Sequence, residues 1–239
     1  NLAQSRRQVL AAERIQEKLP ITFKNERIYQ RYLKRILEWH AINGYGAPKE
    51  KSTKNLYVIG ESHALTSHHL EVSHSGTKFL CKARLIKGCK QWHLGNSASN
   101  QYKQKLESVF RSLGQSSEVL LAIGEIDCRL DSGIITHKNK SADKSLKALV
   151  TNTITNYLDY IANVNLHSHH KIIIQGVPCP NIDTREVSKN SVIELIETIK
   201  LFNLELRNKS KGKGYGFLDL HKLTDRGDGF SNTTWHVDD

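Results

Sequence analysis

The stretch LYVIGESH, residues 56–63, joins a continuous apolar run to a glycine and three polar residues. An apolar run without polar alternation is typical of a strand that is covered on both faces. A glycine at the end of such a strand lets the chain turn sharply and lets a ligand approach the backbone. The stretch therefore predicts a buried strand whose carboxyl end presents Glu61, Ser62 and His63.

Further apolar runs follow along the chain and alternate with longer amphipathic segments. The runs are FLCKARLI (79–86), VLLAIG (119–124), KIIIQGV (171–177) and YGFLDL (215–220), and the expected helices cover about 98–113, 142–163 and 188–208. Strands that alternate with helices predict a parallel sheet with helices on both faces. We therefore expect an α/β, flavodoxin-like three-layer sandwich with a five-stranded parallel sheet, in which ligands bind beyond the carboxyl ends of the strands.

The segment before the first strand has a different pattern. Residues 1–42 carry apolar side chains at near-helical spacing between charges, which predicts a helical N-terminal appendage. Residues 43–55 mix glycine, proline, serine and charge without a period, as linkers do. The main domain is expected over residues 56–239.

The composition and charge of the chain argue against a nucleic-acid or membrane partner. Of the 239 residues, 38% are hydrophobic and 25% charged, as in ordinary globular proteins. The net charge of +11 would suit a polyanion, but the lysines and arginines are scattered, so a basic solvated surface is favoured over a nucleic-acid interface. No run approaches the roughly 18 apolar residues of a membrane helix. A cytoplasmic protein without a membrane partner is expected, although the chain begins at Asn1 and a removed targeting segment stays open. The oligomeric state is left open.

The cysteines and histidines give no metal pattern. The four cysteines lack CxxC spacing, which favours free thiols in a reduced compartment, with a Cys81–Cys89 pair left open. Several histidines follow the first strand, and HSHH occupies residues 167–170, but their spacing suits no helical metal site and HExxH is absent. We therefore expect no metal and no cofactor. Cys128 is expected to be packed and not catalytic.

Polar or special residues follow most of the predicted strands. The blocks are Gly60-Glu61-Ser62, Gly88, Gly124-Glu125-Ile126-Asp127 and Trp235-His236-Val237-Asp238-Asp239. In this order, over residues 56–239, they resemble the SGNH (GDSL-type) hydrolase superfamily, whose blocks are Gly-Asp-Ser, Gly, Gly-x-Asn-Asp and Asp-x-x-His. The resemblance implies an esterase-like hydrolase or acyltransferase that needs no cofactor and acts on a small-molecule or carbohydrate ester.

The same resemblance implies roles for individual residues. Ser62 would be the nucleophile, and its backbone N–H and that of Gly88 would form an oxyanion hole for the charge that develops on the attacked carbonyl. Asp238 would orient a histidine that deprotonates Ser62. Asp127 would organise the site.

This chain departs from the family pattern at two positions. Ile126 stands where the family has the oxyanion asparagine, and its side chain donates no hydrogen bond. The catalytic histidine is expected two residues beyond Asp239, and His236 is the local substitute. A catalytically degenerate binding module is therefore the alternative to an enzyme. Possible replacements for the missing donor are Asn96, Asn181 and Arg129.

Each candidate also has a plain structural interpretation. Ser62 could cap a helix after the first strand. Glu125 and Asp127 could be an acid/base pair, or one could cap a turn while the other binds backbone N–H groups. Arg129 could pair with Asp127 or Asp131, or it could bind an anionic group of a substrate.

Overall fold

The computed structural model describes residues 32–39, 42, 54–140 and 145–234. The chain forms two compact units, and the larger one, residues 53–235, carries the sheet. In the other unit, residues 32–39 form a helix. The remainder of the predicted N-terminal appendage and most of the predicted linker lie outside the described residues.

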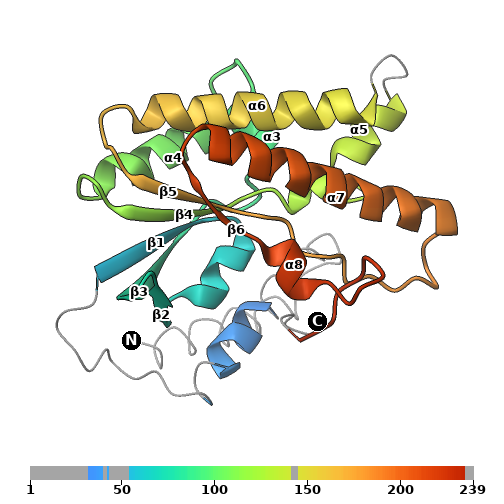
Figure 1. Cartoon of the computed structure of the whole chain (residues 1–239), viewed down its shortest axis with the longest axis horizontal. Coiled ribbons are helices and arrows are strands. Elements are labelled where there is room, and N and C mark those ends of the chain that lie inside the picture. Colours follow the sequence, from blue (N-terminus) through green and yellow to red (C-terminus); the bar gives the residue numbers. More distant parts are fainter. Residues whose placement is uncertain (1–31, 40–41, 43–53, 141–144, 235–239) are drawn as a thin grey trace, which may run out of the picture. The chain divides into compact units, whose positions relative to one another are not determined.

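A six-stranded sheet forms the centre of the larger unit (Figure 1). Its order is β2-β3-β1-β4-β5-β6, with all neighbours parallel except β2 and β3. The predicted flavodoxin-like α/β architecture is confirmed, with six strands in place of five. The chain places β3 on one side of β1 and β4 on the other, so the strand order reverses at β1. The strands are β1 (Lys54–Gly60), β2 (Glu71–His74), β3 (Thr77–Leu85), β4 (Glu118–Ala122), β5 (Lys171–Gln175) and β6 (Gly216–Leu218).

Helices connect the parallel strands and cover the sheet. The three predicted helices correspond to α4, α6 and α7, and α6 and α7 lie over one face in Figure 1. Serine side chains begin the two long helices: Ser145 accepts from Ala148 N at the start of α6, and Ser188 accepts from Ser191 N at the start of α7. The helices are α3 (Gln91–Gly95), α4 (Gln101–Ser112), α5 (Ile134–Lys140), α6 (Leu146–Asn165), α7 (Lys189–Gly212) and α8 (Leu220–Thr224), with 3-10 turns η2 (Ser62–Ser67) and η3 (Ile126–Cys128).

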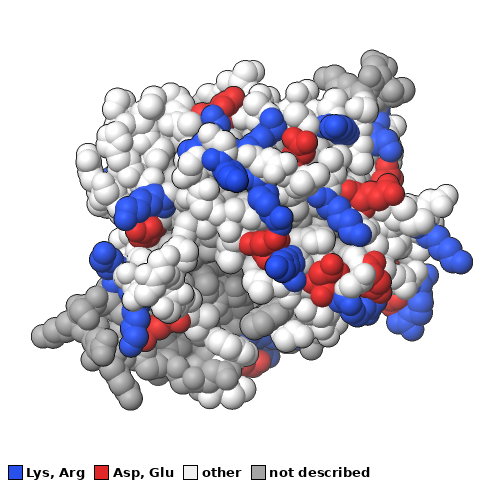
Figure 2. Space-filling model, viewed as in Figure 1, with Lys and Arg blue, Asp and Glu red and all other residues white. Residues whose placement is uncertain are grey.

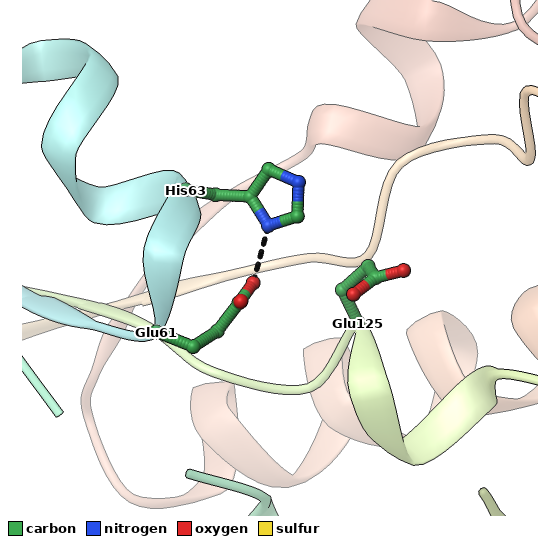
Figure 3. A group of neighbouring side chains, drawn as sticks. All are labelled: Glu61, His63 and Glu125. Carbon is green, nitrogen blue, oxygen red and sulfur yellow. Dashed lines mark hydrogen bonds and ion pairs between the residues drawn. The ribbon is translucent and has the colours of Figure 1, made fainter. Parts of the chain in front are cut away.

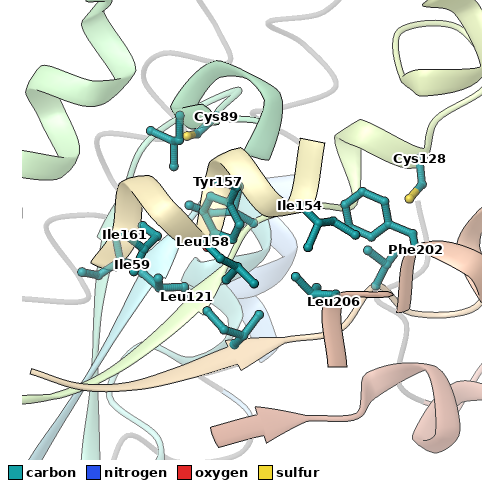
Figure 4. Packing of buried hydrophobic residues seen from close by; sticks show 14 of the residues in the cluster. Ile59, Cys89, Leu121, Cys128, Ile154, Tyr157, Leu158, Ile161, Phe202 and Leu206 are labelled. Carbon is teal, nitrogen blue, oxygen red and sulfur yellow. The ribbon is translucent and has the colours of Figure 1, made fainter. Parts of the chain in front are cut away.

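The core lies on both faces of the sheet. In β4, Val119 and Leu121 join the larger cluster beneath α6 and α7, whereas Leu120 and Ala122 join the smaller cluster on the opposite face. Figure 4 shows Leu121 among side chains of α6 and α7 in the larger cluster. Both faces of this strand are buried, and this explains its continuous apolar run.

Strand β2 was not predicted. It forms a hairpin with β3 through His74, Ser75, Gly76 and Thr77, and the two central residues have positive φ angles of 49° and 74°. Positive φ at both positions is typical of the two-residue turns that match the twist of a hairpin. The segment was missed because most of β2 is exposed and polar.

All four cysteines are free and buried, and the Cys81–Cys89 pair that was left open is not formed. The reason is that Cys81 packs in the smaller cluster and Cys89 in the larger one, on opposite faces of the sheet. Among the described residues, none of the helices has the length and apolar character that crossing a bilayer requires. On the face that Figure 2 shows, Lys and Arg side chains lie among Asp and Glu side chains and not in one basic stripe.

Candidate active site

The loops that follow β1 and β4 meet at the carboxyl edge of the sheet. Gly60 pairs with Ala122 in the parallel register, and Glu61 N donates to Ala122 O at 3.4 Å. A Cβ at Gly60 would overlap the Ala122 carbonyl oxygen, so glycine permits this close approach. The contact between the strand ends brings the segment after Gly60 close to the segment that begins at Glu125.

Ser62 is half-buried and begins η2. The alternative in which Ser62 caps this turn is wrong, because Glu61 is the capping residue and its carboxylate accepts from Ser62 N. The same Glu61 oxygen, Oε2, accepts from Ser62 N and from Ser62 Oγ, each at 2.9 Å. One carboxylate oxygen therefore binds both the hydroxyl of Ser62, which the resemblance makes the nucleophile, and its backbone N–H, which the resemblance places in the oxyanion hole.

The other oxygen of Glu61 binds His63. Glu61 is 2% exposed, and its Oε1 forms a short hydrogen bond with His63 Nδ1, as Figure 3 shows. Burial opposes the charge of Glu61, but His63 outweighs it, with help from Ser62 and Arg129, so the pKa of Glu61 lies below its ordinary value. Burial likewise opposes the charged form of His63, but Glu61 and Glu125 outweigh it and raise the pKa of His63. Both shifts favour the charged forms, so each side chain stabilises the charge of the other.

Glu125 and Arg129 form a second ion pair at the same edge. Arg129 Nε donates to both Glu125 oxygens at 2.9 and 3.0 Å, and Nη2 donates to Oε2 at 2.7 Å. Arg129 therefore pairs with Glu125, and the alternative in which it pairs with Asp127 or Asp131 is wrong. Glu125 lies one turn earlier, where a bidentate contact can form, and Asp127 points away into the interior.

Asp127 binds backbone N–H groups at the start of α3. It is 1% exposed, and its carboxylate accepts from Gln91 N at 2.7 Å and from Trp92 N at 3.0 Å. Burial raises the pKa of Asp127 to about 6, although these two N–H groups oppose the shift. Sequence reasoning missed Gln91, which is fully buried and donates from Nε2 to Ile123 O at 2.8 Å. Its position gives no sequence signal, because a glutamine near a glycine-rich loop is ordinarily exposed.

Gly88 lies in the loop after β3. The start of this loop is tied to the end of β1, because Ile86 N donates to Gly60 O at 2.7 Å. Gly88 has a φ of 72°, which favours glycine, and its N–H donates to no acceptor among the described residues. It therefore has a donor available at the carboxyl edge of the sheet.

The possible replacements for the oxyanion asparagine lie in three different settings. Asn96 Oδ1 accepts from Ala98 N at 2.9 Å. Asn181 lines a cavity of about 260 Å³ between the loop after β5 and the segment after α8. Arg129 is bound to Glu125, as described above. Ile126 itself is half-buried and begins η3.

Three side chains lie close enough together to hold a metal ion. One ligand atom each from Glu61, His63 and Glu125 lies within 4.8 Å of the others (Figure 3). The sequence did not suggest this group because its members follow two different strands. In this structure Glu61 binds Ser62 and His63, while Glu125 binds Arg129. The three side chains therefore belong to a network of hydrogen bonds and ion pairs.

The remaining predicted residues divide into two kinds. Cys128 is 1% exposed, and burial raises the pKa of its thiol well above the ordinary value, which fits a packed residue. His236 and Asp238 lie outside the described residues, so their roles in a triad stay predictions.

Comparisons with known proteins give likenesses among solved structures. No family model matches the chain, and no curated protein does. The chain is similar to an extracellular lipase from Streptomyces rimosus, with 14% identity and a TM-score of 0.43 over 76% of this chain and 86% of that one. It is also similar to a GDSL-like lipase from Bacteroides thetaiotaomicron, with 14% identity and a TM-score of 0.46 over 85% of this chain and 86% of that one.

Proposed function

We propose that this chain is a serine-dependent ester hydrolase or O-acyltransferase that acts through Ser62 on an acyl ester. The observation that carries the proposal is the position of Ser62. It is half-buried at the carboxyl end of β1, where the strand order reverses, and this is where ligands bind in open α/β sheets. An ester of a carbohydrate is our first candidate substrate, on the resemblance of the four sequence blocks.

The reaction follows from the chemistry of a serine hydroxyl. Ser62 Oγ attacks the carbonyl carbon of the ester while a base takes the hydroxyl proton. The tetrahedral intermediate collapses, the base returns the proton to the departing alcohol, and the acyl group stays on Ser62. Water then releases the acid in a hydrolase, or an acceptor hydroxyl takes the acyl group in a transferase. We assign the base to the C-terminal block, through Asp238 and either His236 or a histidine beyond Asp239. The hydroxyl of Ser62 donates to Glu61 Oε2 in this structure, so it would have to turn toward this base before the attack.

The oxyanion would be held by backbone donors. Gly88 offers an N–H that donates to none of the described residues. The N–H of Ser62 is held by Glu61 in this structure and would have to be shared with the oxyanion. A preorganised donor of this kind lowers the barrier by about 3–4 kcal/mol.

A binding module without catalysis is the second candidate, and one observation favours it. Ile126 begins η3 at the position of the family's asparagine and supplies no side-chain donor. In that case the same edge of the sheet would bind a polar ligand without forming an acyl-enzyme.

A fluorophosphonate probe separates the two candidates, because it phosphonylates a serine only where the site activates it. The purified full-length protein is incubated with the probe, and the modified peptide is identified by mass spectrometry. We expect one adduct on Ser62, absent from Ser62→Ala and retained in Ser73→Ala, which changes an exposed serine on β2. A folded wild-type protein that takes up no probe would contradict the enzyme and leave the binding module.

A further inference from the structure

The carboxylate of Glu61 links the proposed nucleophile to a histidine that the proposed reaction does not use. We propose that Glu61 is a positioning residue: it holds the hydroxyl and the backbone amide of Ser62, while the protonated His63 on its other oxygen neutralises its charge. This inference rests on the proposed function and adds to it a pair, Glu61 and His63, that lies next to the nucleophile in sequence and in space.

The two carboxylate oxygens of Glu61 bind different partners. Oε2 accepts from Ser62 N and from Ser62 Oγ at 2.9 Å each, so the hydroxyl and the amide have fixed directions in the resting site. Oε1 is engaged by His63 Nδ1, so the carboxylate cannot rotate without breaking a second bond. Glu61 is also almost fully buried, at 2% exposure, and this confines its side chain further. Bonds to a charged acceptor are about twice as strong as neutral ones, so this arrangement restrains Ser62 strongly.

A bare carboxylate at this place would oppose the reaction. Negative charge develops on the substrate oxygen near the amide of Ser62, and a second negative charge on Glu61 would repel it. His63 bears the compensating positive charge, and its side chain is 47% exposed. The compensation therefore depends on the protonation state of His63.

The neighbouring charged groups act on the charges of both Glu61 and His63. Glu125 faces His63 and stabilises its positive charge, whereas Arg129 opposes that charge and favours the charge of Glu61. Cys89 also faces Glu61, but burial keeps its thiol uncharged. Because the folded pKa of His63 is raised, the compensation is present at and below the ordinary pKa of histidine and is lost as the pH rises through the raised value.

The test measures the rate of phosphonylation of Ser62 as a function of pH in matched variants. Glu61→Gln keeps the shape of the side chain and removes its charge, so we expect labelling at neutral pH to slow by about tenfold. Glu61→Asp keeps the charge and should label faster than Glu61→Gln. The control Glu118→Gln removes an ion pair with Lys171 at the amino end of β4, and its rate should equal that of the wild type.

The pH profile distinguishes positioning from a merely structural role. In the wild type, the rate should fall on the alkaline side as His63 loses its proton. At about pH 6, below the ordinary pKa of histidine, His63→Gln should label as slowly as the wild type does at alkaline pH, and it should show no alkaline decline. The ring of His63 is exposed enough that this change should leave the fold intact, and His167→Gln, at an exposed histidine, should retain the wild-type profile.

The outcomes separate the two proposals. If the wild type labels on Ser62 while Glu61→Gln labels at the same rate, or if His63→Gln keeps the alkaline decline, the positioning role is overturned and the proposed function stands. If the folded wild type takes up no probe, the proposed function is overturned and the positioning role falls with it.

Discussion

Replacing Asp127 by asparagine should change how the stability of the fold depends on pH. Asp127 is buried, accepts two N–H groups at the start of α3, and has a pKa raised to about 6 against an ordinary 3.8. The folded protein therefore keeps the proton of Asp127 at pH values where the unfolded chain has lost it. The stability that this proton contributes is fully present below the unfolded pKa and is lost as the pH rises through the folded pKa.

The size of the effect follows from the two pKa values. A difference of about two units, at about 1.4 kcal/mol for each, makes the wild type roughly 3 kcal/mol less stable above the folded pKa than below the unfolded one, as far as Asp127 is concerned. Asparagine does not titrate, so it removes this dependence. Subtracting the free energies of unfolding of the wild type and Asp127→Asn cancels the other titrating groups.

Urea unfolding at about pH 4 and about pH 7 measures the free energy of unfolding of the wild type and of Asp127→Asn on both sides of the folded pKa. Relative to the variant, the wild type should lose roughly 2.5 kcal/mol of stability between the lower and the higher pH, because pH 4 already lies slightly above the unfolded pKa. Asp131→Asn, at an exposed aspartate of the next loop, should show no such change. A wild-type advantage that stays constant, or that grows with pH, would refute the burial of an aspartate with a raised pKa at this position.

Three further substitutions test separate features. Gly60→Ala should lower the free energy of unfolding by about 1–3 kcal/mol in urea titrations, since the new Cβ would overlap the carbonyl oxygen of Ala122; a variant as stable as the wild type would contradict the close approach of β1 and β4. Tyr157→Phe should raise the free energy of unfolding by about 1 kcal/mol, because the buried hydroxyl has no hydrogen-bond partner in the described structure; clear destabilisation in thermal unfolding would show that the hydroxyl has a partner. Arg129→Gln should cost at most about 1 kcal/mol, because its pair with Glu125 is partly exposed; a larger loss in urea unfolding would indicate a more deeply buried pair.

The strands that were predicted correctly owe their signal to burial on both faces. Residues 56–60 and 119–122 read as continuous apolar runs because successive side chains pack in the two clusters on opposite faces. Strand β2 has no such signal, since Val72 packs against a cluster while Glu71 and Ser73 are exposed. The dipeptide at residues 75–76, Ser-Gly before a predicted strand, was the available indication of a hairpin.

The sequence predicted which residues lie at the carboxyl ends of the strands, but not the contacts between them. Ser62 and Glu125 were expected at the carboxyl ends of strands, and the pairing of β1 with β4 brings these ends together. The contacts within the site depend on backbone turns for which the sequence pattern gives no clear signal. Glu61 binds the next residue and His63 because a 3-10 turn directs both toward its carboxylate. The partner of Arg129 could have been inferred from its spacing, since a carboxylate four residues earlier suits a helical turn.

The sheet ends on its two shortest strands, and this limits the length of strand edge that is open to another molecule. The edges are β2, with four residues, and β6, with three. An exposed strand edge offers unpaired N–H and C=O groups to a strand of another molecule, and the number of groups on offer grows with its length. Here Glu71 adds a charge to one edge. The edge strands cover Thr77–Leu80 of β3 and Ile173–Gln175 of β5, and as short strands they offer few backbone groups to a neighbouring molecule.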